Sequence, residues 1–172
     1  MDSLSVERCK KSGLEAEIGD CTKIKPMGDE TIVCFNLILH HLVANNERNT
    51  KKLQASAVRT WQGNARRIFV HEYIYESYIP NLSGWLIYQI TSSRVLSALG
   101  IAVSKLIPSF RANTFGTGVR FRSHREWTKI FTNEGFYVAK AIIGRDDQVA
   151  LPLRMLLIKN IRRNSYLLES TC

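Results

Sequence analysis

Polar side chains follow two apolar runs of this chain, and they are the residues best suited to acid–base chemistry. Residues 31–35 lead into Asn36 and His40, and residues 67–70 lead into Glu72. An imidazole or a carboxylate can accept a proton from a hydroxyl or a carbon acid during a reaction. Glu72 and His40 are therefore the candidate catalytic residues.

The neighbours of these two residues limit what each can face. Side chains alternate along a strand, so Glu72 points to one face while His71 and Tyr73 point to the other. Consecutive histidines on a helix cannot both enter one pocket, so His41 is interpreted as a surface residue. For His40 the simpler alternative, a surface histidine with satisfied hydrogen bonds, remains open.

The most basic part of the chain is residues 91–133, where seven basic side chains accompany the lone acidic Glu126. Arg120 and Arg122 are the candidate substrate-binding residues, because arginine binds carboxylates and phosphates through charge-assisted hydrogen bonds. Tyr75, where the second apolar run leaves the sheet, is the third candidate. The alternative is a solvated basic loop, and no nucleic-acid-binding module accompanies the formal charge of +9.

The order of apolar runs and amphipathic segments predicts an α/β fold with one mainly parallel sheet. Strands are expected near residues 14–18, 31–36, 66–72, 136–143 and 151–161. Helices are expected near residues 3–12, 47–62, 83–92, 93–107 and 123–134, the last opening with a capping box at Ser123 and Glu126. A polar turn at 144–147 predicts an antiparallel hairpin of the last two strands. The run at 31–36 lacks alternation, which is typical of a strand buried on both faces.

Length and composition fit one domain over residues 1–172. The four cysteines show no spacing of the metal or redox kind, so no metal site is predicted and reduced thiols of a cytoplasmic protein are expected. No stretch reaches the roughly 18 uncharged apolar residues of a membrane span. The most apolar region, residues 85–107, is interrupted by Arg94 and Lys105, and a lipid-facing role for it remains open.

Several segments, taken in order, resemble class I S-adenosylmethionine-dependent methyltransferases. They are Gly19-Asp20-Cys21, residues 31–43, residues 63–72, and Glu126-Trp127 through Phe131 with Gly135-Phe136 before the final hairpin. The resemblance covers nearly the whole chain and implies S-adenosylmethionine as cofactor. In that family an acidic residue after the third strand lies beside the adenine, which implies a cofactor-binding role for Asp20 and its neighbour Cys21. The end of the fourth strand passes under the methionine part, which implies the same role for Asn36.

One departure from the family is the absence of its glycine-rich loop after the first strand. Asp2 matches the acidic residue that binds the ribose hydroxyls, so the chain would start just after the family's second strand. The resemblance thus implies a single, N-terminally incomplete, partial Rossmann-like sheet with an open edge. Weak or absent cofactor binding and self-association through that edge are expected.

The resemblance implies methyl transfer to a small-molecule acceptor, with an anionic acceptor as one option and residues 77–122 as a helical lid on the substrate side. A truncated chain of this kind can also be inactive. The rival interpretation is a non-enzymatic binding or assembly protein that keeps the second half of the fold. A basic RNA-associated domain is the third.

Overall fold

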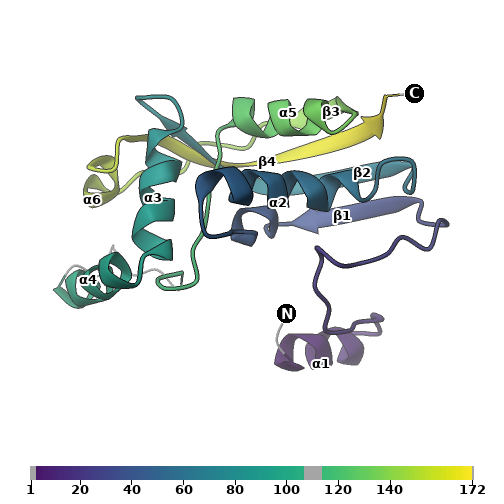
Figure 1. The fold of residues 1–172 in the computed structure, drawn as a ribbon, viewed down its shortest axis with the longest axis horizontal. Coiled ribbons are helices and arrows are strands. Elements are labelled where there is room, and N and C mark those ends of the chain that lie inside the picture. Colours follow the sequence, from purple (N-terminus) through teal and green to yellow (C-terminus); the bar gives the residue numbers. More distant parts are fainter. Residues whose placement is uncertain (1–2, 107–113, 172) are drawn as a thin grey trace.

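The computed structural model of this protein describes residues 3–106 and 114–171 (Figure 1). Its elements in chain order are α1 (Ser3–Lys11), β1 (Ile32–Asn36), the 3-10 helix η1 (Leu39–His41), α2 (Glu47–Arg59), β2 (Arg67–Ser77), α3 (Leu82–Ser92), α4 (Arg94–Leu106), α5 (His124–Asn133), β3 (Phe136–Ile142), α6 (Leu151–Arg154) and β4 (Ile158–Ser170). Among the predicted positions, Asp2 and residues 107–113 of the expected lid lie outside the described residues.

The four strands form one sheet in the order β1-β2-β4-β3. β1 and β2 are parallel neighbours, with Asn36 opposite His71 at their carboxyl ends. β4 pairs antiparallel with β2 on one side and with β3 on the other. The predicted α/β class, the parallel pair and the antiparallel C-terminal pair are confirmed. Within the described residues no strand forms before β1, and β4 alone runs opposite to the other three strands.

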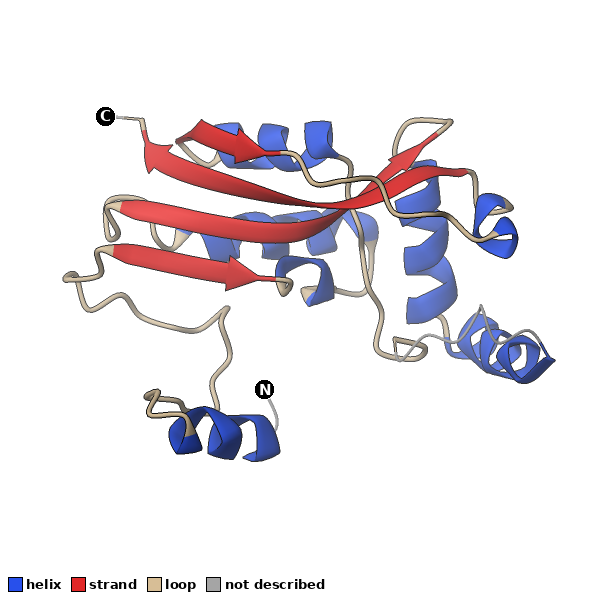
Figure 2. Cartoon of the chain, turned by 180° about the vertical axis from the view of Figure 1, so that it is seen from behind, coloured by secondary structure: helices blue, strands red, loops and turns tan. Residues whose placement is uncertain are grey.

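Residues 14–18, which were predicted to be a strand, have no strand partner. Leu14 and Ile18 expose 60% and 64% of their surface. A strand of this length is stable only when a neighbouring strand or helix satisfies its backbone and covers its apolar side. The segment instead belongs to the arm that joins α1 to the sheet, where it lies away from β1 (Figures 1 and 2). This strand prediction was wrong.

The last strand begins later than the sequence pattern predicted. Leu151–Arg154 forms α6, and β4 then runs from Ile158 to Ser170. Proline suits the first turn of a helix, where a missing backbone N–H has no cost, so Pro152 favours α6 over a strand. The polar residues 144–147 therefore begin a longer connection between β3 and β4 and do not form a tight hairpin turn.

Helices α2 and α5 cover one face of the sheet, the face seen in Figure 1. Apolar side chains that alternate along β2 and β4 pack there against Trp127 and Phe131 of α5. Seen from behind, β1 and the amino-terminal half of β2 carry no helix in the described part of the chain (Figure 2). Phe35 of β1 is 4% exposed whereas Ile32 is 51% exposed. β1 is therefore buried on one face only, and the prediction of a strand buried on both faces was wrong.

The two helices predicted near 83–92 and 93–107 are present as α3 and α4. They follow each other after one residue and are bent by 95°. Within the described residues no single helix is long and apolar enough to cross a membrane, and α3 and α4 pass that test only when taken together. α4 lies at one end of the molecule, away from the sheet, in both ribbon views.

Candidate active site

The parallel pairing of β1 with β2 brings His40 close to Glu72. The pairing ends at Asn36 and His71, and Glu72 is the next residue of β2, which continues to Ser77. After Asn36, Leu37 adopts a left-handed conformation (φ 53°) and donates its backbone N–H to the carbonyl of His71. This bend turns the chain over the middle of β2 into η1. His40 then lies directly above Glu72, which β2 points to the same side.

Glu72 is held by two hydrogen bonds, one to the backbone and one to the imidazole. Its Oε1 accepts the backbone N–H of Leu39 at 2.6 Å, and its Oε2 lies 2.6 Å from Nδ1 of His40. The side chains of His40 and Glu72 are 5% and 0% exposed. A carboxylate that accepts Nδ1–H fixes the imidazole tautomer in which Nε2 carries the lone pair. Nε2 of His40 has no hydrogen-bond partner among the described residues.

A stack of aromatic rings fixes the plane of the His40 imidazole. Phe121 stacks on His40 with ring centroids 4.8 Å apart and on Tyr75 with centroids 4.1 Å apart. Tyr73 meets the His40 and Phe121 rings edge-on at 5.8 and 6.2 Å. Burial raises the pKa of Tyr75 to about 12, so its phenol stays neutral across the physiological range. Tyr75, predicted to bind substrate, is part of the ring stack.

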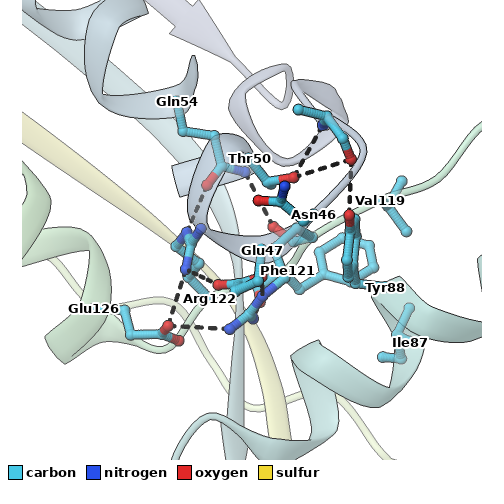
Figure 3. A network of polar contacts seen from close by, with 12 residues as sticks. Asn46, Glu47, Thr50, Gln54, Ile87, Tyr88, Val119, Phe121, Arg122 and Glu126 are labelled. Atoms are coloured by element: carbon cyan, nitrogen blue, oxygen red, sulfur yellow. Dashed lines mark hydrogen bonds and ion pairs between the residues drawn. The ribbon is translucent and has the colours of Figure 1, made fainter. Parts of the chain in front are cut away.

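Arg120 and Arg122 are buried inside the protein, at 2% and 1% exposure. Nε of Arg120 lies 2.8 Å from Glu47, and Nη1 of Arg122 lies 3.1 Å from Glu47 and 3.0 Å from Glu126 (Figure 3). Nε of Arg122 donates to Gln54 at 2.5 Å. Desolvation lowers the pKa of Arg122. The alternative of a solvated basic loop is wrong for these two arginines, because both are buried and paired with internal carboxylates. Their predicted role in binding substrate stays a prediction.

The same network supports the backbone that carries His40. The carbonyl of His40 accepts the backbone N–H of Arg120 at 2.8 Å. The carbonyl of Leu39 accepts the amide of Gln54 at 3.0 Å. Gly84 of α3 lies against the backbone of Phe121, where a Cβ atom would collide with the Phe121 carbonyl. The arginines thus act indirectly, by holding η1 and the segment that contains Phe121.

The predicted cofactor-binding residues are not brought together with the His40–Glu72 pair. Asp20 is on the exposed arm, where its Oδ1 accepts Thr22 N–H and hydroxyl at 3.0 and 2.6 Å. The Thr22 hydroxyl makes the largest contribution to lowering the pKa of Asp20 to about 2. Cys21 is half-buried, which raises its pKa, and Asn36 is exposed at the end of β1.

These residues do not by themselves fit S-adenosylmethionine. The carboxylate of Asp20 is already engaged by its own turn and by Lys23 at 3.1 Å. β1 is an edge strand in the described chain, so no backbone amides face Asn36 from beyond that edge. The described chain supplies at most one side of a cofactor site, and Asp2 lies outside it. Within the described residues, no group of three or more His, Cys, Asp or Glu side chains could hold a metal ion.

Three members of the site carried little signal in the sequence. Gln54 lies on the apolar face of α2 and is 0% exposed. A polar residue on an apolar face is the only feature of the sequence that indicates a buried hydrogen-bonding role for it. Glu47 resembles an ordinary residue in the first turn of a helix. Phe121 is visible in the sequence only as an aromatic residue between two arginines.

The four-stranded sheet and the helices that cover it form a mixed α/β fold, which is similar to that of a solved methyltransferase. The structure of the mitomycin 7-O-methyltransferase MmcR is similar, with a TM-score of 0.50 at 13% identity, over 95% of this chain and 37% of that one. PigF with SAH has a TM-score of 0.48 at 14% identity, covering 98% of this chain and 40% of that one. LepI in complex with SAM has a TM-score of 0.47 at 10% identity, covering 98% and 34%.

At 13% identity the similarity to the MmcR structure shows the fold alone. This chain spans 34% to 40% of the length of those three structures. No protein-family model and no curated protein matches the sequence.

A second cluster near the site gives the stability of the protein a dependence on pH. Nδ1 of His124 lies 2.9 Å from the hydroxyl of Tyr166. Burial lowers the pKa of His124 from 6.5, the charge of Arg162 lowers it further, and Glu76 partly offsets both. The unfolded chain therefore takes up this proton at a higher pH than the folded protein.

We expect the free energy of unfolding to be constant well above pH 6.5 and to fall as the pH drops below it. Urea unfolding followed by tryptophan fluorescence between pH 7.5 and 5.5 measures this slope. The pKa of His41 is also lowered, so His41 contributes to the pH dependence in the same direction. The contribution of His124 is therefore the difference in slope between the wild type and His124→Gln. An equal slope in the wild type and in His124→Gln would contradict the assignment.

Proposed function

We propose that this chain carries the acceptor side of a site for methyl transfer to a hydroxyl group of a small molecule. The observation that supports this proposal is the buried His40–Glu72 pair, which lies where the parallel pairing of β1 with β2 ends. In this proposal His40 is the general base that takes the hydroxyl proton on Nε2. Glu72 is the positioning residue that keeps Nδ1 protonated and stabilises the imidazolium.

S-adenosylmethionine is the methyl donor in this proposal, by analogy of fold with proteins such as MmcR. Asp20, Cys21 and Asn36 would contribute to one side of its site. The remaining contacts would come from residues beyond those described or from another polypeptide. We therefore assign to this chain only the orientation of the acceptor and the removal of its proton.

The segment 77–122 is proposed to cover the acceptor. Its first helix is fixed near the site, because the hydroxyl of Tyr88 donates to the carbonyl of Ala44 at 2.7 Å and Gly84 lies against Phe121. Because Arg120 and Arg122 are both paired with internal carboxylates, their charges give little support to an anionic acceptor. A neutral hydroxyl acceptor is therefore favoured.

The test is transfer of label from methyl-labelled S-adenosylmethionine to a panel of phenols and aliphatic alcohols. Once the other side of the cofactor site is supplied, we expect label in at least one acceptor with the wild-type chain and a large loss with His40→Gln. Transfer that does not depend on His40 would contradict the proposed role of this residue.

A second candidate function is assembly, and a specific observation favours it. The open edge of β1 and the uncovered apolar Ile32 beside it can pair with a strand of another chain. In that case the wild-type chain transfers no label to any acceptor, and light scattering shows self-association that increases with concentration.

A further inference from the structure

α4 turns its small residues toward the protein. Ser97 is 3% exposed, and its hydroxyl lies 2.8 Å from the carbonyl of Ile90 and 2.9 Å from the backbone nitrogen of Gly116. At Gly100 a Cβ atom would collide with the ring of Phe115. Only small side chains fit on this face, so the inward side of α4 is filled.

The apolar side chains of α4 consequently point to solvent. Val95, Leu99 and Val103, which are spaced along one face of the helix, are 70%, 58% and 42% exposed. Leu96 beside them is 40% exposed, and Ile101, on the side of α4 that carries Arg94 and Lys105, is 46% exposed. Soluble monomers rarely leave a contiguous apolar patch of this kind uncovered, and such patches mark interaction sites.

The charged residues of the segment 82–125 are all basic. No Asp or Glu occurs between residues 82 and 125, and exposed Arg94 and Lys105 flank the apolar face of α4. The whole chain carries a formal charge of +9. Trp85 of α3 is 41% exposed, and tryptophan favours the boundary between water and lipid. An apolar surface that is flanked by cations complements a lipid surface with anionic headgroups.

We propose that the exposed face of α4 binds the surface of an anionic lipid bilayer. A helix of 13 residues is about 20 Å long, which is shorter than the roughly 30 Å hydrocarbon core of a bilayer. The 95° bend to α3 prevents the two helices from forming one straight span. α4 therefore lies in the plane of the interface, with its apolar side chains among the acyl chains and its cations at the headgroups.

The test is sedimentation with vesicles of phosphatidylcholine alone and of phosphatidylcholine with phosphatidylglycerol at a ratio of about 3:1. We expect binding to the anionic vesicles, which weakens as salt is raised, and little binding to the neutral ones. Trp61 and Trp127 are 6% and 0% exposed, so a blue shift of tryptophan fluorescence on binding reports Trp85.

The variant Val95→Glu with Leu99→Glu should bind anionic vesicles at least about tenfold more weakly than the wild type. The carboxylates remove apolar contact with the acyl chains and repel the anionic headgroups. Leu14→Glu, an equally exposed position on the arm, is the control and should bind like the wild type. Circular dichroism confirms that each variant is folded. Arg94→Gln with Lys105→Gln keeps the apolar face and should lose only the preference for anionic lipid.

Equal vesicle binding by the glutamate variant and the wild type would overturn the proposal. Equal binding to neutral and anionic vesicles would overturn it too. A dimer seen by light scattering and abolished by Val95→Glu with Leu99→Glu would show instead that this face binds a second copy of the chain.

Discussion

Replacing His40 with glutamine is expected to lower the rate of methyl transfer by about 10²–10⁴-fold. Glutamine keeps the size and polarity of the side chain but cannot take up the proton that the acceptor hydroxyl must lose. Nδ1 of His40 lies 2.6 Å from a buried carboxylate, so the imidazole is held in one orientation and one tautomer. Initial rates with a saturating acceptor and labelled S-adenosylmethionine measure the effect.

Two variants distinguish catalysis from damage to the fold. His41→Gln changes the neighbouring imidazole, which has no hydrogen bond to Glu72, and should keep nearly the full rate. Glu72→Gln should retain acceptor binding but lower the rate and change its pH profile, because an amide no longer stabilises the imidazolium. Rates for His40→Gln and His41→Gln that fall equally would refute the proposed role of His40.

Replacing Arg122 with alanine is expected to lower the free energy of unfolding by about 3 kcal/mol. The change removes the ion pair to Glu126, which is 16% exposed, and the hydrogen bond to the side-chain oxygen of Gln54. It also removes the guanidinium whose Cζ lies 6.0 Å from the ring of Trp127. Urea unfolding at neutral pH measures the loss.

Arg125→Ala is the matched control for this prediction. Arg125 lies three residues further on and is exposed, so its removal should change stability by about 0.5 kcal/mol or less. Arg122→Met tests whether shape alone suffices, and should recover part of the loss because the apolar stem still packs. A loss for Arg122→Ala no larger than that for Arg125→Ala would return Arg122 to the surface role that the sequence suggested.

The parts of the fold that local chemistry determines could be predicted from the sequence. The capping box at Ser123 and Glu126 forms as predicted, with both of its hydrogen bonds present. The apolar runs that became β1 and β2 are parallel neighbours, and the polar residues after them meet. Such features depend on a few adjacent residues, or on the rule that parallel strands end at one edge.

The predictions that were wrong concern features that depend on residues far away in the sequence. Residues 14–18 alternate like a strand, yet no other strand pairs with them. Arg120 and Arg122 lie in a basic segment, and their burial depends on Glu47, more than 70 residues earlier in the chain. The apolar stripe of α4 was visible in the sequence, but its direction is set by the small residues opposite it. No local pattern reveals which carboxylate or which face a side chain will meet.

The position of β4 in the sheet has a consequence for synthesis of the protein. β4 is the last of the described strands along the chain, yet it lies between β2 and β3 and is the only strand in the described sheet that joins them. Ile68 of β2 pairs with Leu168, so this ladder closes a loop of about one hundred residues. Until residues 158–170 have left the ribosome, the nascent chain therefore presents β2 with one edge unpaired and β3 without any partner. The sheet is completed only when β4 has emerged, and a premature stop before residue 158 leaves two separate strand edges open to chaperones and proteases.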